Sequence, residues 1–206
     1  MLFLDFLEQE EDPDYIFSGD AVLFTINEEH HTPTSWLACS KNDCHFSKRH
    51  STESFLTHSG KVFQIYGKGR LTKNDPIRYG DEVALFYRVN DNGDGLWMSC
   101  AAGTKRCGLG ACPGLPHLNH WMWNSQHSCN ENKFFITESL SFQSNGSSSG
   151  QPLRIEHQIK LVKKVDYLSN ADGKRHLQGR KESLIGTPFL ENSGNWVIKK
   201  GTHRRS

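Results

Sequence analysis

The residues of this chain with the most reactive side chains are its six cysteines and eleven histidines. Thiolate and imidazole are the ligands that Zn²⁺ prefers. No two cysteines have the Cys-x2-Cys spacing that makes a structural zinc site a strong prediction. We therefore expect no metal, and nothing in the sequence indicates a cofactor. The cysteines are Cys39, Cys44, Cys100, Cys107, Cys112 and Cys129.

The expected state of the cysteines depends on the compartment. Cys39 and Cys100 stand at matching places on two similar segments, and we expect both to be small buried apolar residues. The even number of cysteines leaves disulfides open, and a bridge between Cys112 and Cys129 is the first to test if the chain is secreted. The chain begins MLFLDFL and continues with acidic residues, which is not the pattern of a signal peptide. We expect a cytoplasmic location, where thiols stay reduced.

The segment 108–130 (GLGACPGLPHLNHWMWNSQHSCN) gathers the side chains best suited to hold a ligand. It is about ten residues longer than the matching segments elsewhere in the chain. Tryptophan offers a rigid face that stacks on sugar rings and anchors protein interfaces. The alternative is that both tryptophans fold down and fill the core. The residues expected to bind the ligand are Trp121, Trp123, His117, His120, Asn119 and Asn124.

Charge, hydropathy and motifs exclude several classes of protein. Lys and Arg number 24 against 23 Asp and Glu, so there is no electrostatic reason to expect nucleic acid. No stretch approaches the roughly 20 apolar residues that span a bilayer. Neither a phosphate-binding glycine loop nor a His-Glu-x-x-His metalloprotease motif occurs. We expect a protein that is not an enzyme and has no transmembrane segment.

Short strands separated by turns run through the chain. Residues 21–26 and 82–89 are rich in β-branched and aromatic side chains. The run 90–95 (NDNGDG) consists of residues that tolerate the positive φ angles of turns. No twelve-residue segment carries a convincing helical period. The pattern predicts an all-β protein with about twelve strands.

The strands recur in three blocks. Gly19-Asp20-Ala21-Val22 returns as Gly80-Asp81-Glu82-Val83, and in both blocks a tryptophan follows the valine after fourteen residues. A weaker third block begins near Ile159, and similar strands close the blocks near 62, 134 and 196. The offsets are 61 and 76 for the opening strands, and 72 and 62 for the closing strands. The residues expected in the core are Trp36, Trp97, Tyr167, Cys39, Cys100, Phe63, Phe135 and Trp196.

A chain of three such blocks resembles the β-trefoil superfamily. Ricin-type lectins, fascins, histactophilins, fibroblast growth factors and interleukin-1-like cytokines have this fold, and the sequence matches none of these families in particular. The Gln-x-Trp signature of ricin-type lectins is absent. The resemblance implies one domain over 17–200, with repeats at about 17–70, 71–145 and 150–200. Residues 1–16 then form an N-terminal extension and 201–206 a basic tail. The alternative architecture is a β-sandwich.

The resemblance implies a binding protein. We expect a non-enzymatic module that recognises a glycan or a protein in a lectin-like manner through the 108–130 loop. The alternative is an intracellular protein of the fascin or histactophilin kind, which binds actin or another protein scaffold through charged groups. Binding through exposed charges weakens steeply with salt, whereas stacking on tryptophan does not.

Overall fold

The computed structural model is all-β, which confirms the expected fold class. It describes residues 14–26, 35–41, 43–48, 62–70, 75–88, 95–100, 107–111, 132–138, 150–162, 167–170, 182–187 and 196–201. No helix in these ranges is long and apolar enough to cross a membrane. The strands are β1 (Ala21–Ile26), β2 (Ser35–Cys39), β3 (Cys44–Lys48), β4 (Phe63–Gly67), β5 (Glu82–Arg88), β6 (Gly95–Cys100), β7 (Cys107–Gly110), β8 (Phe134–Glu138), β9 (Gln158–Val162), β10 (Tyr167–Asn170), β11 (Glu182–Thr187) and β12 (Trp196–Lys200).

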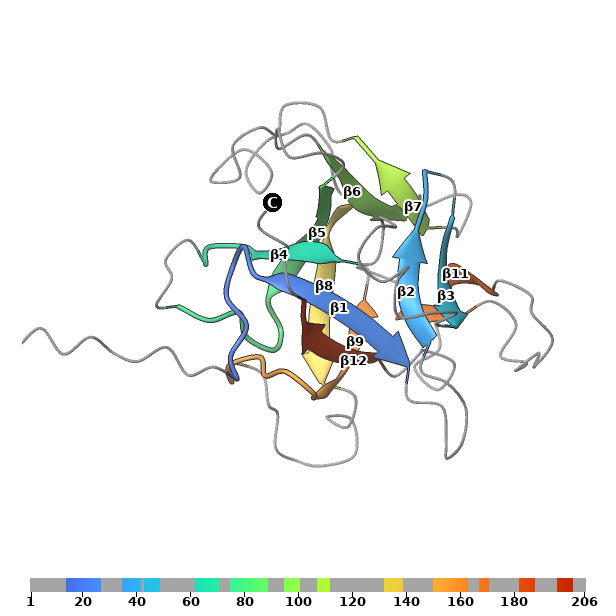
Figure 1. Ribbon diagram of the computed structural model, residues 1–206. Helices are drawn as coiled ribbons and strands as arrows, with labels where there is room; N and C mark the ends of the chain where they lie inside the picture. The colour runs from blue at the N-terminus through green and yellow to red at the C-terminus, as the bar shows by residue number, and fades with distance from the viewer. Residues whose placement is uncertain are drawn as a thin grey trace, which may run out of the picture.

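Six of the strands close into a barrel (Figure 1). In order around the ring they are β1, β4, β5, β8, β9 and β12, and β12 returns to β1. Every one of these pairings is antiparallel. All twelve strands belong to a single sheet, so the architecture is not the pair of separate sheets that a β-sandwich has.

The register of the barrel divides the strands into three equivalent copies, β1–β4, β5–β8 and β9–β12. Val22 pairs with Phe63, Val83 with Phe134, and Ile159 with Trp196. The offsets of 61 and 76 between the opening strands are therefore confirmed. The closing strands need one correction, because the partner in the first copy is Phe63 and not the preceding residue. The first closing offset is thus one residue shorter than the sequence comparison suggested.

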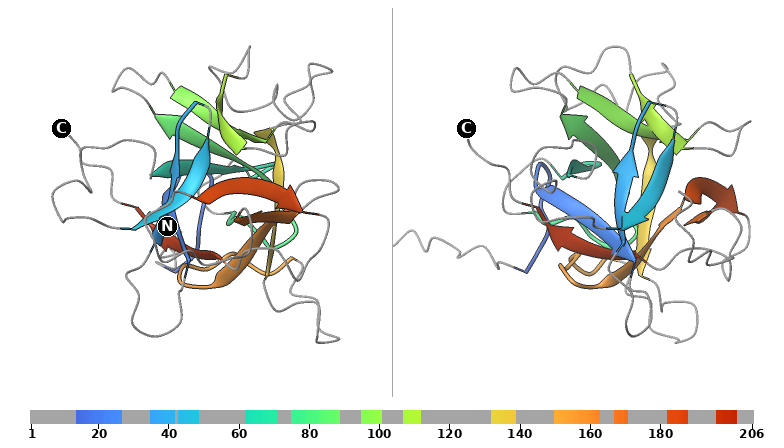
Figure 2. Two further views of the ribbon diagram at one scale, coloured as in Figure 1. Left: turned by 90° about the vertical axis from the view of Figure 1, so that its right-hand side faces the viewer. Right: turned by 45° about the vertical axis from the view of Figure 1, so that its right-hand side comes forward.

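The three remaining strand pairs are hairpins that gather at one end of the barrel, on the right in Figure 1. They are β2–β3, β6–β7 and β10–β11. β3 pairs directly with β11, which joins the first hairpin to the third. The view of Figure 2 turned by 90° brings this end toward the reader. The hairpins cover the end of the barrel at which β1, β5 and β9 finish.

The aromatic residue that opens each hairpin lies at an equivalent backbone position. Trp36 pairs with Thr25, Trp97 with Phe86, and Tyr167 with Val162. Trp97 is 3% exposed. Trp36 is only partly buried, because it lies on the outer face of an alternating strand whose next residue fills the core. The expectation that Trp36 is a core residue is therefore wrong; the side chain of Tyr167 lies outside the described residues.

The barrel interior is filled by apolar side chains from matching positions of the three copies. Phe63 and Trp196 are fully buried, and so are the six residues of the central layer of the barrel. Phe135 was expected in the core, but it is 36% exposed. Successive side chains of a strand point to opposite faces, so the interior position belongs to its neighbour Phe134. The central layer consists of Ile65, Ile136, Ile198, Phe24, Leu85 and Leu161.

The end of the barrel away from the hairpins is closed by a ring of backbone hydrogen bonds. Ile16 donates to the carbonyl of Leu153 at 3.0 Å, Ile77 to Ile16 at 2.9 Å, and Leu153 to Ile77 at 2.7 Å. All three side chains are fully buried. The segments that precede β1, β5 and β9 thus meet at one point, and side chains just after that point are brought together from three distant parts of the chain.

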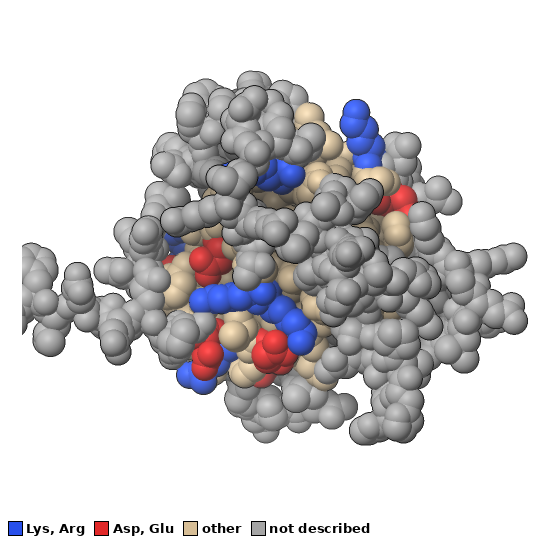
Figure 3. All heavy atoms as spheres, in the orientation of Figure 1, with Lys and Arg blue, Asp and Glu red and all other residues tan. Residues whose placement is uncertain are grey.

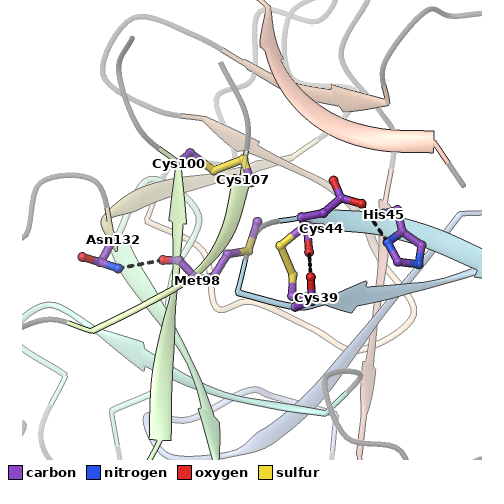
Figure 4. The surroundings of a disulfide bond; sticks show 9 residues. Cys39, Cys44, His45, Met98, Cys100, Cys107 and Asn132 are labelled. Carbon is purple, nitrogen blue, oxygen red and sulfur yellow. Dashed lines mark hydrogen bonds and ion pairs between the residues drawn. A yellow bond between two sulfur atoms is a disulfide. The ribbon is translucent and has the colours of Figure 1, made fainter. Parts of the chain in front are cut away.

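Two hairpins carry a disulfide at the same place (Figure 4). Cys39 faces Cys44 across the first hairpin and Cys100 faces Cys107 across the second; each pair is bonded. Cys39 and Cys100 are buried in the core, as expected, but each forms a disulfide, so the expectation that they are free thiols is wrong. A facing position on an antiparallel hairpin brings two side chains within bonding distance, which residue spacing alone did not reveal. The proposed Cys112–Cys129 bridge lies outside the described residues.

Candidate functional site

The first two copies begin with the same tight turn. Gly19 and Gly80 each have φ of +95°, a conformation that glycine adopts without steric cost. Asp20 and Asp81 follow, and each carboxylate accepts a hydrogen bond from the backbone N–H three residues earlier, at 3.0 and 2.9 Å. The glycine therefore permits the positive φ of this turn, and the aspartate stabilises the turn through its side-chain hydrogen bond.

The third copy keeps the backbone of this turn but replaces both residues. Glu156 stands at the glycine position with φ of +62°, where side chains are disfavoured. His157 stands at the aspartate position. The backbone N–H of Arg154, which lacks an aspartate partner here, hydrogen-bonds instead to the hydroxyl of Tyr79. Nδ1 of His157 lies 3.0 Å from the same hydroxyl.

The boundary between the first and second copies is filled by an ion-pair network. Arg70 donates from Nε and Nη2 to Asp81 at 2.8 and 3.1 Å, and from Nη1 to both oxygens of Asp75 at 3.1 and 2.9 Å. The hydrogen bonds to Asp81 and then to Asp75 raise the pKa of Arg70 above its ordinary value. A guanidinium held between two carboxylates thus occupies this boundary.

The equivalent boundary between the second and third copies contains a hollow of about 330 Å³, which we call the third-copy hollow. Gln151 takes the place of Asp75 and His157 the place of Asp81, 76 residues further along the chain. Neither replacement carries a carboxylate, so the pair of carboxylates that binds Arg70 at the first boundary has no counterpart at these two positions. The hollow is lined by Tyr79, Glu138, Gln151, Pro152, Arg154 and His157.

Tyr79 contributes a buried side chain to the hollow, whereas Gln151, Arg154 and His157 are exposed. Burial, and to a smaller extent the nearby carboxylate of Glu138, raise the pKa of Tyr79 to about 12. The phenol therefore keeps its proton at neutral pH. The Tyr79 hydroxyl and Nδ1 of His157 lie within hydrogen-bonding distance, at 3.0 Å.

Charges of both signs surround the hollow. Arg154 donates to the hydroxyl of Tyr15 at 3.0 Å and lies 5.1 Å from the centre of that ring. Glu156, which directly precedes the lining residue His157, forms an ion pair with Lys199 at 3.1 Å. Figure 3 shows basic and acidic side chains interspersed on the described part of one face. The described surface in that view is mixed in charge rather than dominated by one sign.

The residues predicted to bind a ligand, Trp121, Trp123, His117, His120, Asn119 and Asn124, lie outside the described residues. The loop prediction therefore stays a prediction. The third-copy hollow was missed because the third block was recognised only from its strand at 158. Extending the comparison of the blocks back by two residues would have placed Glu156-His157 against Gly-Asp. That mismatch is the sequence feature that could have indicated the third-copy hollow.

Within the ranges that the structure describes, no group of three or more His, Cys, Asp or Glu side chains could hold a metal ion. Nδ1 of His45 lies 3.2 Å from the carboxylate of Asp43, and Figure 4 shows His45 next to the Cys39–Cys44 disulfide. The same figure shows Asn132 donating to the carbonyl of Met98 at 3.1 Å. These polar contacts hold the hairpin region together.

No protein-family model matches the chain, and no curated protein matches it. Among solved structures the chain is similar to a Caenorhabditis elegans protein of unknown function, with TM-score 0.53 and 15% identity over 93% of this chain and 99% of that one. It is similar to the SDF2-like protein from Arabidopsis thaliana, with TM-score 0.53 and 10% identity over 92% and 97%.

The chain is also similar to a part of the Saccharomyces cerevisiae protein O-mannosyltransferase Pmt1-Pmt2 complex, whose structure was solved with the sugar donor bound. The TM-score is 0.54 and the identity 9%, over 96% of this chain and 27% of that one. This chain therefore spans about a quarter of that enzyme chain. At identities this low, the three likenesses concern the fold alone.

Proposed function

We propose that the chain is a non-enzymatic binding module of β-trefoil architecture that recognises a glycan in the third-copy hollow. The observation that carries the proposal is the difference between two equivalent boundaries. One is filled by Arg70 between two carboxylates, and the other has Gln151 and His157 in place of those carboxylates, beside an open space. The threefold repeat is broken at this boundary, and the third-copy hollow therefore has room for a ligand. The boundary filled by Arg70 has no such room.

The architecture part of the proposal rests on the threefold register. Six barrel strands, three hairpins and one ring of hydrogen bonds at Ile16, Ile77 and Leu153 repeat the same unit three times. The superfamily that the sequence resembles is organised in this way. Glycan-binding proteins are among its members, as are cytokines and cytoskeletal proteins.

Binding is favoured over catalysis by the state of the buried phenol. A Tyr79 that keeps its proton far above neutral pH is a poor base and a poor nucleophile. It is instead a buried polar group that orients the ring of His157 through a hydrogen bond of 3.0 Å. Groups held in this way serve recognition, because a ligand meets donors and acceptors that are already oriented.

A glycan is favoured over other small ligands by the mixture of groups around the hollow. The carboxylate of Glu138 accepts hydrogen bonds, the guanidinium of Arg154 donates them, and the amide of Gln151 does both. A sugar hydroxyl also donates and accepts, so it can satisfy each of these groups in turn. The mannosyltransferase structure with its sugar donor supports the idea only through its fold.

The test is a glycan array probed with the native protein and with the Gln151→Ala/His157→Ala variant. We expect the native protein to bind a defined set of glycans, and the variant to lose that binding while keeping its melting temperature within a few degrees. Lys68→Ala, an exposed change at the filled boundary, is the matched control and should bind normally. Absence of any glycan binding by the native protein contradicts the proposal.

A protein ligand is the other outcome that the experiment distinguishes. A scaffold binder of the fascin or histactophilin kind would give no signal on the array, and its binding to a protein partner would weaken steeply between low and high salt. Recognition through oriented hydrogen bonds in a partly buried site depends much less on salt.

We also propose that the chain acquires its fold in an oxidising compartment. The cytoplasmic expectation was based on the lack of a signal-peptide pattern and implied reduced thiols, whereas four of the six cysteines form the disulfides Cys39–Cys44 and Cys100–Cys107. Structural disulfides persist where the environment is oxidising. Fractionation of cells that express the full-length chain would place it in a secretory compartment, and recovery of the fully reduced chain from the cytosol would contradict this.

A further inference from the structure

We infer that the third hairpin, β10–β11, opens by separation of its two strands while the rest of the barrel stays folded, and that this opening uncovers the indole of Trp196. The inference is independent of the proposed function, because the third-copy hollow lies beside Leu153, at the end of the barrel away from the hairpins. It comes from a comparison of three hairpins that share one register.

The third hairpin lacks the cross-link of the other two. At the place where the first two hairpins carry a disulfide, Asn170 faces Leu184. The bonded cysteines are 5 and 7 positions apart in the sequence, whereas all of 171–183 lies between Asn170 and Leu184. Closing a longer loop costs more conformational entropy, and here no covalent bond offsets that cost. The third hairpin is therefore the least firmly closed of the three.

The third hairpin also contributes less to the core. Phe46 and Leu109 stand at equivalent places in β3 and β7, and both are buried in the core. The equivalent residue of β11 is Gly186, which has no side chain to bury. Separating β11 from its neighbours therefore exposes less apolar surface at this position than separating β3 or β7 does.

The core of the third copy is filled from the barrel wall instead. Trp196 of β12 stands where the other copies have Phe63 and Phe134, and it is fully buried. Its ring centre lies 5.8 Å from that of Phe24 and 5.2 Å from that of Phe46. These two partners belong to β1 and β3, so their contacts with Trp196 do not depend on β10 or β11.

The indole N–H of Trp196 favours the open state. Its nitrogen is buried and has no hydrogen-bond partner in the described part of the structure. A buried donor without an acceptor is rare and costly. Water that reaches the indole accepts this hydrogen bond, so contact with water stabilises the opened form relative to the closed one.

The third hairpin adjoins this ring through β3. Phe46, which packs on Trp196, pairs through its backbone with Glu182 of β11, and Figure 1 shows β11 beside β3. The closed hairpin is held to its neighbours by the pairing of Glu182 and Ser183 with β3 and of Tyr167 with β9. The barrel pairings of β12 with β1 and β9 do not involve the hairpin, so the barrel can stay closed when the hairpin opens.

The inference is tested by native-state hydrogen exchange of the oxidised full-length protein, followed by NMR in increasing low concentrations of urea. The hydrogen-bonded amides of β10 and β11 should exchange about tenfold or more faster than those of the two cross-linked hairpins, at rates that depend little on urea, because a local opening exposes little surface. The Trp196 indole N–H, assigned by its absence in Trp196→Phe, should follow the same opening. Exchange of either group only through global unfolding overturns the inference.

A designed cross-link tests the motion itself. Asn170→Cys/Leu184→Cys places a disulfide at the facing position that carries one in the other hairpins, and peptide mapping of the unreduced protein verifies the bond. Exchange of the β10–β11 amides and of the Trp196 indole should become about tenfold or more slower. The matched control Asn170→Ser/Leu184→Ser has side chains of similar size without the bond and should show no such slowing. Unchanged exchange in the bridged variant would show that β10 and β11 do not separate, which overturns the inference.

Discussion

Among the residues that the structure describes, Glu156 is the one residue other than glycine that has a positive φ. It has φ of +62° where the other copies have glycine. A side chain in this conformation is disfavoured by about 1 kcal/mol or more. Its ion pair with Lys199 involves a carboxylate side chain that is 60% exposed, and exposed pairs contribute little. Local strain of this kind often accompanies a functional site.

Replacing that residue should stabilise the protein. We expect Glu156→Gly to raise the free energy of unfolding by about 1 kcal/mol, since glycine accepts the positive φ without steric cost. Urea denaturation measures the change. The matched control is Gly80→Glu, which places a side chain at φ of +95° in the second copy and should destabilise by a similar amount. Stabilisation by both changes would contradict the argument.

The phenol of Tyr79 should make stability depend on alkaline pH. Its pKa is raised by burial from 10.0 to about 12 in the folded chain. Below pH 10 the phenol keeps its proton in both the folded and the unfolded chain, and its contribution to the free energy of unfolding is fully present. Above pH 10 the unfolded chain ionises first, so the free energy of unfolding falls, by up to about 3 kcal/mol as the pH reaches 12.

The comparison that isolates this effect is Tyr79→Phe. The variant should lack this part of the alkaline loss, although it should be less stable than the native protein at pH 7 because the contacts of the hydroxyl are gone. Equilibrium denaturation between pH 9 and pH 12 measures both curves. Parallel curves for the two proteins over that range would show that the phenol ionises equally in both states.

The two equivalent tryptophans should differ in their contribution to stability. Trp97 is 3% exposed, whereas Trp36 is partly buried. Trp97→Ala should cost about 3 to 5 kcal/mol through lost burial and an unfilled cavity. Trp36→Ala should cost clearly less, because part of its ring already contacts solvent. Thermal denaturation of the two single variants checks the order, and a larger loss for Trp36→Ala would reverse it.

At the scale of the elements, the hairpins are the parts in which the three copies differ most. Two of them are cross-linked by disulfides between facing residues. In the third, the corresponding pair is Asn170 and Leu184, which cannot be cross-linked. A backbone hydrogen bond of 2.7 Å from Leu109 to Ser40 connects the first two hairpins. The cross-linked hairpins thus support each other, while the third depends on its strand pairings.

Each disulfide should make a measurable contribution to stability. The loops that they close are short, with 5 and 7 residues of sequence separation. Loop-closure entropy then predicts about 2 kcal/mol for each. We expect Cys100→Ala/Cys107→Ala to lose that amount in chemical denaturation. In the denatured but unreduced native protein, these two cysteines and the Cys39–Cys44 pair should not react with a thiol reagent; reaction at all six would contradict the assignment.

At the scale of the whole molecule, two candidate ligand sites compete, the third-copy hollow and the 108–130 loop. If the loop holds the main contact, Trp121→Ala/Trp123→Ala should abolish glycan binding and leave thermal stability nearly unchanged. If the hollow holds it, this double variant should bind normally. A loss of several kcal/mol of stability would show that the tryptophans fill the core, as the alternative interpretation states. The array used for the hollow variants measures binding in both cases.

The sequence alone predicted the all-β class, the threefold repeat and the offsets of the opening strands. These properties follow from local alternation of side chains and from turn residues, which act over a few residues along the chain. The same information could not assign Phe135 correctly, because a shift of one residue exchanges the two faces of a strand and only the pairing decides which face is interior. Trp36 was wrongly expected in the core for the same reason, because the sequence does not show which face of β2 is interior.

The disulfides and the hollow were decided only by the tertiary structure. Cys39 and Cys44 become partners because the register of a hairpin sets them opposite each other, a property of two strands and not of one segment. The hollow needs Tyr79, Glu138 and His157 from three separate parts of the chain. They meet because the ring of hydrogen bonds at Ile16, Ile77 and Leu153 closes the barrel end, and contacts over such separations exist only once the whole barrel has closed.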